Sequence, residues 1–366
     1  MKKFLIILSS LTFIYERLCS FTVFILVYIN FYFKDKHRRD LIDKIFYAGA
    51  ETRNVGGPYL KIQKLKKFFP ENIWKFNIIY VLSNSPKLND WSIKLIKKRK
   101  IPLILNQNGV FYPAWYKGDY ERQNLPMSKI YHYADYVFWQ SNFCKRASDR
   151  FLGKRLGQGE ILYNSVDTKI FYPKKEANHN IFRFLITGNI RKQNNYRIYS
   201  VFEAFQEIIV NNKYVHLYIA GIIEDIEYLK TEINKLNINE YITFLGPYSL
   251  KDAPFIYQMA DAYVTMSFQD NCPTAVIEAM SCGLPILYSS SGGIPELVGN
   301  NSGIGLEVSE DWEKINVPKK QQIYMGLLEI MEKRNDMSVF ARERAVKLFD
   351  IDSWIKRHKE IFEIFK

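Results

Sequence analysis

Cysteine is scarce in this chain. Its 366 residues include only Cys19, Cys144, Cys272 and Cys282. They form no C-x-x-C pair, and none is combined with a histidine at the spacing of a structural zinc site. A small protein held together by disulfides and a zinc module are therefore excluded, and a reducing compartment is expected.

The chain also lacks an uninterrupted apolar run of the about 20 residues that span a bilayer. Residues 4–15 and 18–33 are apolar but are separated by Glu16 and Arg17, and the basic run "KDKHRRD" follows. No small-residue cleavage site lies between the runs. We expect residues 1–40 to be a membrane anchor, either one imperfect span or a shallow hairpin. The alternative is two buried helices of a soluble fold. The basic flank predicts a body on the cytoplasmic face, in a bacterium at the inner membrane.

Negative charge is scarce in the first half only. Residues 34–176 carry 28 Lys and Arg against 13 Asp and Glu, whereas residues 177–366 carry 20 against 24. No zinc-finger spacing or aromatic RNA-binding box accompanies the basic half, so nucleic acid is not an expected partner. The runs "KIQKLKKFF" (61–69) and "IKLIKKRK" (93–100) alternate lysines with apolar residues, a pattern that favours contact with an anionic membrane surface.

The order of apolar segments predicts an α/β protein. A chain of this length usually forms two domains, and short β-rich runs alternate with helical ones, as in doubly wound parallel sheets. We expect one domain over residues 41–176, another over 177–349 and a terminal helix at 350–366 that packs back on the body. The expected strands are 44–49, 76–83, 101–107, 135–141 and 160–165, then 181–188, 215–221, 241–246, 261–267 and 284–290.

Two turns after expected strands are suited to bind phosphate. Ligands of such sheets bind beyond the carboxyl ends of the strands. Paired glycines after the first strand let the backbone approach a phosphate, although an ordinary flexible loop is an equal alternative. The turn "LITGNIRKQNNYR" places cations beside a helix N-terminus, as a pyrophosphate clamp or as solvated surface. The residues concerned are Gly56 and Gly57 in the first turn and Gly188, Arg191, Lys192 and Arg197 in the second.

The third turn, "SFQDNCPTAVIEAM", places two carboxylates around a helix start. A proline at position 273 fits the first helical turn, so the amides of Thr274 and Ala275 point outward as an anion site. Glu278 lies on the same helical face, where it can accept both hydroxyls of a ribose, and Asp270 can meet a sugar beyond the phosphates. The alternative is that Glu278 pairs with a core cation and Asp270 caps a turn. The D-x-D at 350–352 opens the last helix and predicts a cap rather than a metal site.

The stretch from Asp270 through Glu278, "EAMSCGLPI" and "GGIPELVG" resembles the donor-site signature of family 4 glycosyltransferases. The resemblance extends to Gly56-Gly57, "ADYVFWQS" and "NSVDTKIFYP". It implies the GT-B fold, in which two Rossmann-like domains face a cleft, with the acceptor on the first domain and the nucleotide sugar on the second. It implies a retaining transfer without a metal or other cofactor, from a UDP- or GDP-linked sugar. Asp270 and Glu278 would be the catalytic-site carboxylates, and the loop containing Pro247 and Tyr248 would adjoin the base.

The chain departs from that family pattern at several positions. Its first acid is aspartate instead of glutamate, the basic pair after Gly188 is displaced, and no histidine follows the third strand, where "LILNQNGV" stands. With the basic, anchored first half, the resemblance predicts transfer to a membrane-held saccharide or lipid-linked acceptor in surface polysaccharide or lipopolysaccharide synthesis. A sugar-nucleotide epimerase and a non-catalytic protein of the same fold are the alternatives.

Overall fold

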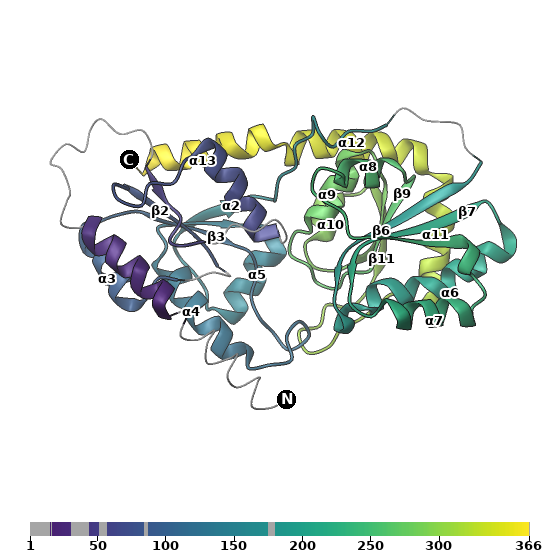
Figure 1. Cartoon of the computed structure of the whole chain (residues 1–366), viewed down its shortest axis with the longest axis horizontal. Helices are drawn as coiled ribbons and strands as arrows, with labels where there is room; N and C mark the ends of the chain where they lie inside the picture. Colours follow the sequence, from purple (N-terminus) through teal and green to yellow (C-terminus); the bar gives the residue numbers. More distant parts are fainter. Residues whose placement is uncertain are drawn as a thin grey trace.

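A computed structural model describes residues 15, 17–30, 44–50, 57–83, 87–174 and 180–365 of the chain. It contains two parallel sheets, which lie at opposite ends of the long axis of the molecule (Figure 1). The α/β fold expected from the sequence is therefore confirmed. Each of the ten expected strands overlaps a strand of the structure.

The first sheet has the order β1-β2-β3-β4-β5, and all neighbours pair in parallel. Strand β2, with sequence IIYVL, is a continuous apolar run with every residue buried, as expected where helices cover both faces of a sheet. The strands are β1 (Ile45–Phe46), β2 (Ile78–Leu82), β3 (Leu103–Gln107), β4 (Tyr136–Trp139) and β5 (Gln158–Ile161), and the helices are α2 (Gly57–Phe68), α3 (Asp90–Arg99), α4 (Tyr120–Tyr133) and α5 (Asn142–Phe151).

The second sheet has the order β11-β10-β9-β6-β7-β8 and is also parallel throughout. The chain first builds outward from β6 to β8 and then returns to add β9 on the other side of β6. The carboxyl ends of β6 and β9 therefore form the point where strand order reverses, which is where ligands of such sheets bind. The strands are β6 (Phe182–Ile190), β7 (Val215–Ile223), β8 (Ile242–Gly246), β9 (Ala262–Thr265), β10 (Ile286–Ser290) and β11 (Gly303–Glu307).

Helices cover the second sheet on both faces, over two separate apolar cores. One core lies under α6 and α11, and the other lies under α9 and α12. The helical elements are η1 (Lys192–Asn194), α6 (Tyr196–Asn211), α7 (Ile226–Lys235), η2 (Asn239–Tyr241), α8 (Ala253–Gln258), α9 (Thr274–Ser281), α10 (Ile294–Val298), α11 (Lys320–Glu332) and α12 (Arg334–Phe349).

The last helix, α13 (Ile351–Ile364), returns to the first sheet (Figure 1). Trp354, Ile361 and Phe362 are buried in one cluster with Tyr47 and Tyr80 of the first half. Asp350 accepts a hydrogen bond from the amide of Asp352 and so caps this helix. The capping role expected for the D-x-D is confirmed, and the described residues contain no cluster of side chains suited to a metal.

Replacing Phe362 by alanine is expected to destabilise the protein by about 3–5 kcal/mol, the usual cost of an aromatic-sized core cavity. The ring is fully buried and lies edge-on to Phe69, with 5.0 Å between ring centroids. Ile364→Ala, at a side chain that is 66% exposed on the same helix, is the control and should change stability by less than about 0.5 kcal/mol. Urea unfolding of both variants makes the comparison, and equal stabilities would show that this packing does not hold α13.

A helix over residues 17–30 packs on the first half. Val23 and Val27 are buried in the core under the first sheet, whereas Leu18 and Phe21 on another face are more than half exposed. Within the described ranges, no helix has the length and apolar character needed to cross a bilayer. The rest of the expected anchor, residues 1–14, 16 and 31–40, lies outside the described residues.

Candidate active site

A cavity of about 430 Å³ lies at the reversal point of the second sheet and is lined from both halves of the chain. Tyr112 and Trp115 belong to the first half. In the second half, Asn189 lies at the end of β6, Arg197 at the start of α6 and Asp270 on the loop after β9. A cavity thus lies where the strand order predicts a ligand, and the carboxylate of Asp270 and the guanidinium of Arg197 line it.

Asp270 lies on the loop between β9 and α9. Its Oδ1 atom accepts a hydrogen bond of 3.3 Å from the amide of Cys272. Burial raises the pKa of Asp270, and the nearby charge of Arg197 opposes that rise. The carboxylate is thus held at a fixed position in the cavity wall, with part of its hydrogen-bonding capacity left for a ligand.

The glycines after β10 hold the loop of Asp270 in place. The amide of Gly293 donates to the carbonyl of Asp270 at 2.8 Å. A Cβ atom on Gly292 would lie 2.4 Å from that same carbonyl oxygen, and one on Gly293 would lie 2.0 Å from the carbonyl oxygen of Asn271. Because Gly292 also has a φ of +68°, only glycine fits there.

Glu278 lies in α9, one turn beyond its start. Its Oε2 atom accepts a hydrogen bond of 2.9 Å from the hydroxyl of Tyr257. Burial raises its pKa, while the hydrogen bond from Tyr257 and the charge of Lys64 oppose the rise. No described side chain caps α9, which follows Pro273. The amides of Thr274 and Ala275 therefore remain donors toward an anion, one turn before Glu278.

The three cations expected to clamp a pyrophosphate differ in position. Arg191 and Arg197 line the cavity. Lys192 is instead exposed and lies 3.5 Å from Asp225. Burial alone would lower the pKa of Arg197, but Tyr196 and Asp270 outweigh it, so that the pKa is raised. The Nε atom of Arg197 is buried and has no hydrogen-bond partner among the described residues. Arg197 is therefore the cation best placed for a ligand in the cavity.

The remaining expected residues lie around these groups. Gly188 is on β6 with a φ of +156°, beside Gly221 of β7. Pro247 and Tyr248 follow β8. Burial raises the pKa of Tyr248, and its neighbours include Glu278 and the hydroxyl group of Thr187. Gly57 begins α2. Gly56 lies outside the described residues.

Two lysines of the run 61–69, which the sequence assigned to a membrane-facing surface, instead turn inward from α2 and lie near the cavity. That expectation is wrong for Lys61 and Lys64. Lys61 is buried and donates to the Oδ1 atoms of Asn106 and Asn108 at 2.7 and 3.0 Å. Lys64 donates to the carbonyl of Ser165 at 2.7 Å. Their i, i+3 spacing in the sequence places the two lysines on one face of the helix, next to the buried Ile62 and Leu65.

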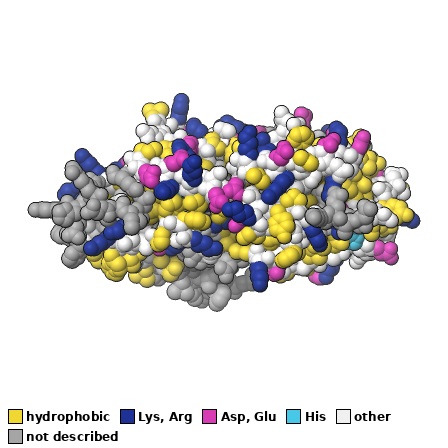
Figure 2. Space-filling model, turned by 90° about the horizontal axis from the view of Figure 1, so that it is seen from above, with side chains coloured by type: hydrophobic (Ala, Val, Ile, Leu, Met, Phe, Trp, Pro, Cys, Tyr) yellow, Lys and Arg dark blue, Asp and Glu magenta, His cyan; other side chains and the backbone are white. Residues whose placement is uncertain are grey.

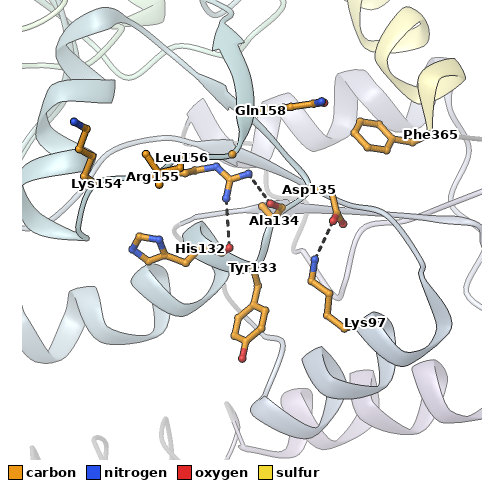
Figure 3. Close-up of a pocket in the computed structure, with 11 residues that line it drawn as sticks. Lys97, His132, Tyr133, Ala134, Asp135, Lys154, Arg155, Leu156, Gln158 and Phe365 are labelled. Carbon is orange, nitrogen blue, oxygen red and sulfur yellow. Dashed lines mark hydrogen bonds and ion pairs between the residues drawn. The ribbon is translucent and has the colours of Figure 1, made fainter.

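A second cavity, of about 630 Å³, lies at the edge of the first sheet (Figure 3). Two of its cations are already engaged, because Arg155 donates to the carbonyl of Ala134 and Lys97 pairs with Asp135 at 2.9 Å (Figure 3). None of the residues expected from the sequence lines this cavity. Arg191, Arg197 and Asp270 line the smaller cavity between the two halves, which is therefore the candidate site. Thr274, Ala275 and Glu278 are not among its lining residues but follow Asp270 on α9.

Glu296 of α10 joins the two halves beside the candidate site. Its carboxylate accepts hydrogen bonds of 2.7 and 2.8 Å from the amides of Asn142 and Phe143, which begin α5. A second contact is made by Trp312, whose carbonyl accepts from the amide of Ala114 at 2.8 Å and whose ring stacks on Phe143. The carboxylate of Glu296 thus binds the first amides of α5 from the other half of the chain, where the helix dipole favours a negative charge.

Glu296→Gln is expected to lower the free energy of unfolding by about 1–2 kcal/mol, because a neutral amide cannot accept as strongly from both amides and loses the dipole interaction. The control is Glu310→Gln, which breaks an exposed pair with Arg146 and should cost less than about 1 kcal/mol. Denaturant titration of the full chain gives both values. A Glu296→Gln variant as stable as the control would mean that this contact contributes nothing.

Comparison with known proteins adds the family. The family model described as "Glycosyl transferases group 1" matches residues 168–343, which include β6 to β11 and both site carboxylates. This segment, just under half of the chain, is similar to the group 1 glycosyl transferases. The family agrees with the resemblance read from the sequence; membership of family 4 in particular is not tested.

Among curated proteins, a D-inositol 3-phosphate glycosyltransferase of Mycobacterium sp. (strain KMS) is 34% identical over 65 residues, 18% of this chain and 15% of that protein. An O-antigen chain mannosyltransferase B of Escherichia coli is 37% identical over 60 residues, 16% of each chain. The matched segment is thus well under two thirds of the length of these relatives.

Solved structures share the whole two-sheet arrangement. HepE of Anabaena, crystallised in complex with UDP, superposes with a TM-score of 0.63 at 16% identity and covers 83% of this chain and 81% of that one. A glycosyltransferase of Rickettsia africae gives a TM-score of 0.62 at 17% identity, over 84% of this chain and 79% of that one. At this identity the similarity is one of fold, and the fold is that of the GT-B glycosyltransferases.

Proposed function

We propose that the protein is a retaining glycosyltransferase, which moves a sugar from a UDP- or GDP-linked donor to a membrane-held saccharide or lipid-linked acceptor. The observation that carries the proposal is the arrangement around α9 in the segment that matches the group 1 family. Asp270 lines the cavity at the reversal point of the sheet, and the uncapped amides of Thr274 and Ala275 and then Glu278 follow it along the chain. In the proposed complex, the transferred sugar contacts Asp270, the diphosphate contacts the two amides, and the ribose contacts Glu278.

The proposed chemistry is stabilisation of a leaving group. Negative charge grows on the diphosphate as the bond to the sugar breaks, and fixed donors aimed at that charge lower the barrier. The amides at the start of α9 and the guanidinium of Arg197 are such donors. Asp270 orients the sugar hydroxyls, and Glu278 accepts the ribose hydroxyls. The acceptor attacks from the face that the diphosphate leaves, and a phosphate oxygen takes its proton, so the anomeric configuration is kept.

The proposed acceptor is held at the cytoplasmic face of a bacterial inner membrane. The helix over 17–30 exposes Leu18, Phe21 and Tyr28, and nearby Trp91 of α3 is 71% exposed. Figure 2 shows hydrophobic side chains gathered along the edge of the molecule at the end that holds the first sheet. Lysines accompany them, since Lys94 lies over the ring of Trp91 and Lys87 over that of Tyr15. Apolar and basic groups together suit an anionic bilayer surface.

A flotation experiment tests the membrane part. The protein is expected to bind vesicles that contain phosphatidylglycerol and not neutral phosphatidylcholine vesicles. Serine at positions 18 and 21 should weaken that binding, while serine in place of Leu250, an exposed leucine of the second half, should not. Equal binding of all three proteins would contradict the proposed surface.

A transfer assay tests the reaction. Detergent-purified protein is incubated with UDP-glucose, UDP-N-acetylglucosamine or GDP-mannose and a polyprenyl-diphosphate-linked sugar, and products are followed by mass spectrometry and NMR. A lipid-linked product with the donor's anomeric configuration is expected. Conversion of the donor sugar without an acceptor would favour an epimerase, and nucleotide binding without any turnover would favour a non-catalytic protein.

A further inference from the structure

Helix α2 places a buried lysine, Lys61, and a half-buried lysine, Lys64, one turn apart, and neither forms an ion pair with a described carboxylate. In the described part of the chain, Lys61 bonds only the amide oxygens of Asn106 and Asn108, and Lys64 only the carbonyl of Ser165. Lys61 is 6% exposed. The carboxylates of Glu278 and Asp167 act on Lys64 from a distance, whereas Lys61 has no such neighbour. A buried charge without an opposite charge is costly. An ammonium group has three donors, so one remains on Lys61 and two remain on Lys64.

Both lysines lie next to the loop that begins α9, in the other half of the chain. Lys64 holds Ser165, and the adjacent Asn164 donates to the carbonyl of Cys272 at 2.7 Å. Lys61 holds Asn108, and the adjacent Gly109 is so close to Asn271 that a Cβ atom would lie 2.5 Å from the side-chain nitrogen of Asn271. These two chains of contacts bracket residues 271–273, immediately before the free amides of Thr274 and Ala275.

We propose that Lys61 and Lys64 bind the diphosphate of the donor from the first half, opposite the amides of α9. This inference rests on the proposed function and assigns the missing part of its phosphate clamp. The second half supplies fewer cations than expected, because Lys192 turns away to Asp225. The first half supplies two instead, and an anion held between both halves would also favour their closure around the donor.

The surroundings of Lys61 make this binding depend on pH. Burial lowers the pKa of Lys61 to about 7, so a bound diphosphate selects its protonated form. The titratable groups that face it are Lys64, whose pKa burial also lowers, the thiols of Cys144 and Cys272, and His358. Burial raises both thiol pKa values to about 12 and lowers that of His358 to about 3, so these three stay neutral between pH 7 and 9.

Calorimetric titration of the full protein with UDP and GDP, and with uridine and guanosine as ligands without phosphate, tests the assignment. Methionine replaces each lysine, since it keeps the length and removes the charge. In Lys61→Met and Lys64→Met we expect affinity for the diphosphate to fall at least about 10-fold, with affinity for the nucleoside unchanged. Lys67→Met, at an exposed position of the same helix, is the control and should bind like wild type.

The pH series gives a second readout. Wild-type affinity for the diphosphate is expected to fall between pH 7 and 9, and Lys61→Met should flatten that dependence. Unchanged diphosphate affinity in both variants would overturn the assignment of the lysines and leave the proposed function standing. An equal loss of nucleoside and diphosphate affinity would mean a merely structural role and also overturn it. Failure of the wild type to bind UDP or GDP would overturn both proposals.

Discussion

Glu278→Gln is expected to lower kcat/KM by roughly 10²- to 10³-fold. A carboxylate that accepts two ribose hydroxyls makes two hydrogen bonds to a charged group, each worth about 1.5–3 kcal/mol, and the amide loses the charge in both. Steady-state transfer with the natural nucleotide donor measures the loss. The control is Glu203→Gln on the exposed face of α6, which should leave kcat/KM within about twofold. Wild-type turnover by Glu278→Gln would contradict a ribose contact.

The same substitution is expected to raise the melting temperature at pH 7. Burial raises the pKa of Glu278 in the folded protein, so its ionised form destabilises the fold at every pH above the unfolded pKa of about 4.3. That penalty disappears as the pH falls and the group is protonated. Glutamine removes it at neutral pH and can still accept from Tyr257. A variant that is more stable and much less active would show that the carboxylate is kept for binding and not for packing.

Asp270→Asn is expected to lower kcat by roughly 10²- to 10³-fold with little change in affinity for the free nucleoside diphosphate. Asparagine has the same shape, so the loop fixed by Gly293 should remain, but orientation of the sugar and the charge beside Arg197 are lost. Single-turnover rates and diphosphate titrations separate the two effects.

Asp336→Asn, at an exposed position of α12, is the control for that experiment. A loss of diphosphate affinity in Asp270→Asn as large as its loss of kcat would place Asp270 at the phosphates and contradict the position proposed for the sugar.

Most of the fold was predictable from the sequence because buried parallel strands are short continuous apolar runs. Strand β11 was missed for the same reason, since its sequence GIGLE has only two apolar side chains larger than glycine. It pairs along its whole length with β10, where a Cβ atom on Gly303 would lie 2.1 Å from the carbonyl oxygen of Ile286. The glycine at position 303 is needed for this close backbone approach, and hydrophobicity alone does not reveal the strand.

The carboxylates of the site were predictable, but their partners were not. Spacing along one helix placed Glu278 one turn beyond two free amides, and the structure has that geometry. The neighbours of Glu278 come from α8 and α2, at separations of 21 residues or more. The contact of Glu296 with the first amides of α5 spans 154 residues. Such contacts depend on how the two halves meet, which no local pattern specifies.

The most direct test of the central claim is titration of the wild-type protein and Glu278→Gln with UDP, GDP, ADP and CMP. Binding of one nucleotide in the micromolar range, with the affinity at least about 10-fold weaker in the variant, is the expected result. Binding of none of the four, or equal binding by both proteins, would contradict a nucleotide-sugar site at the start of α9.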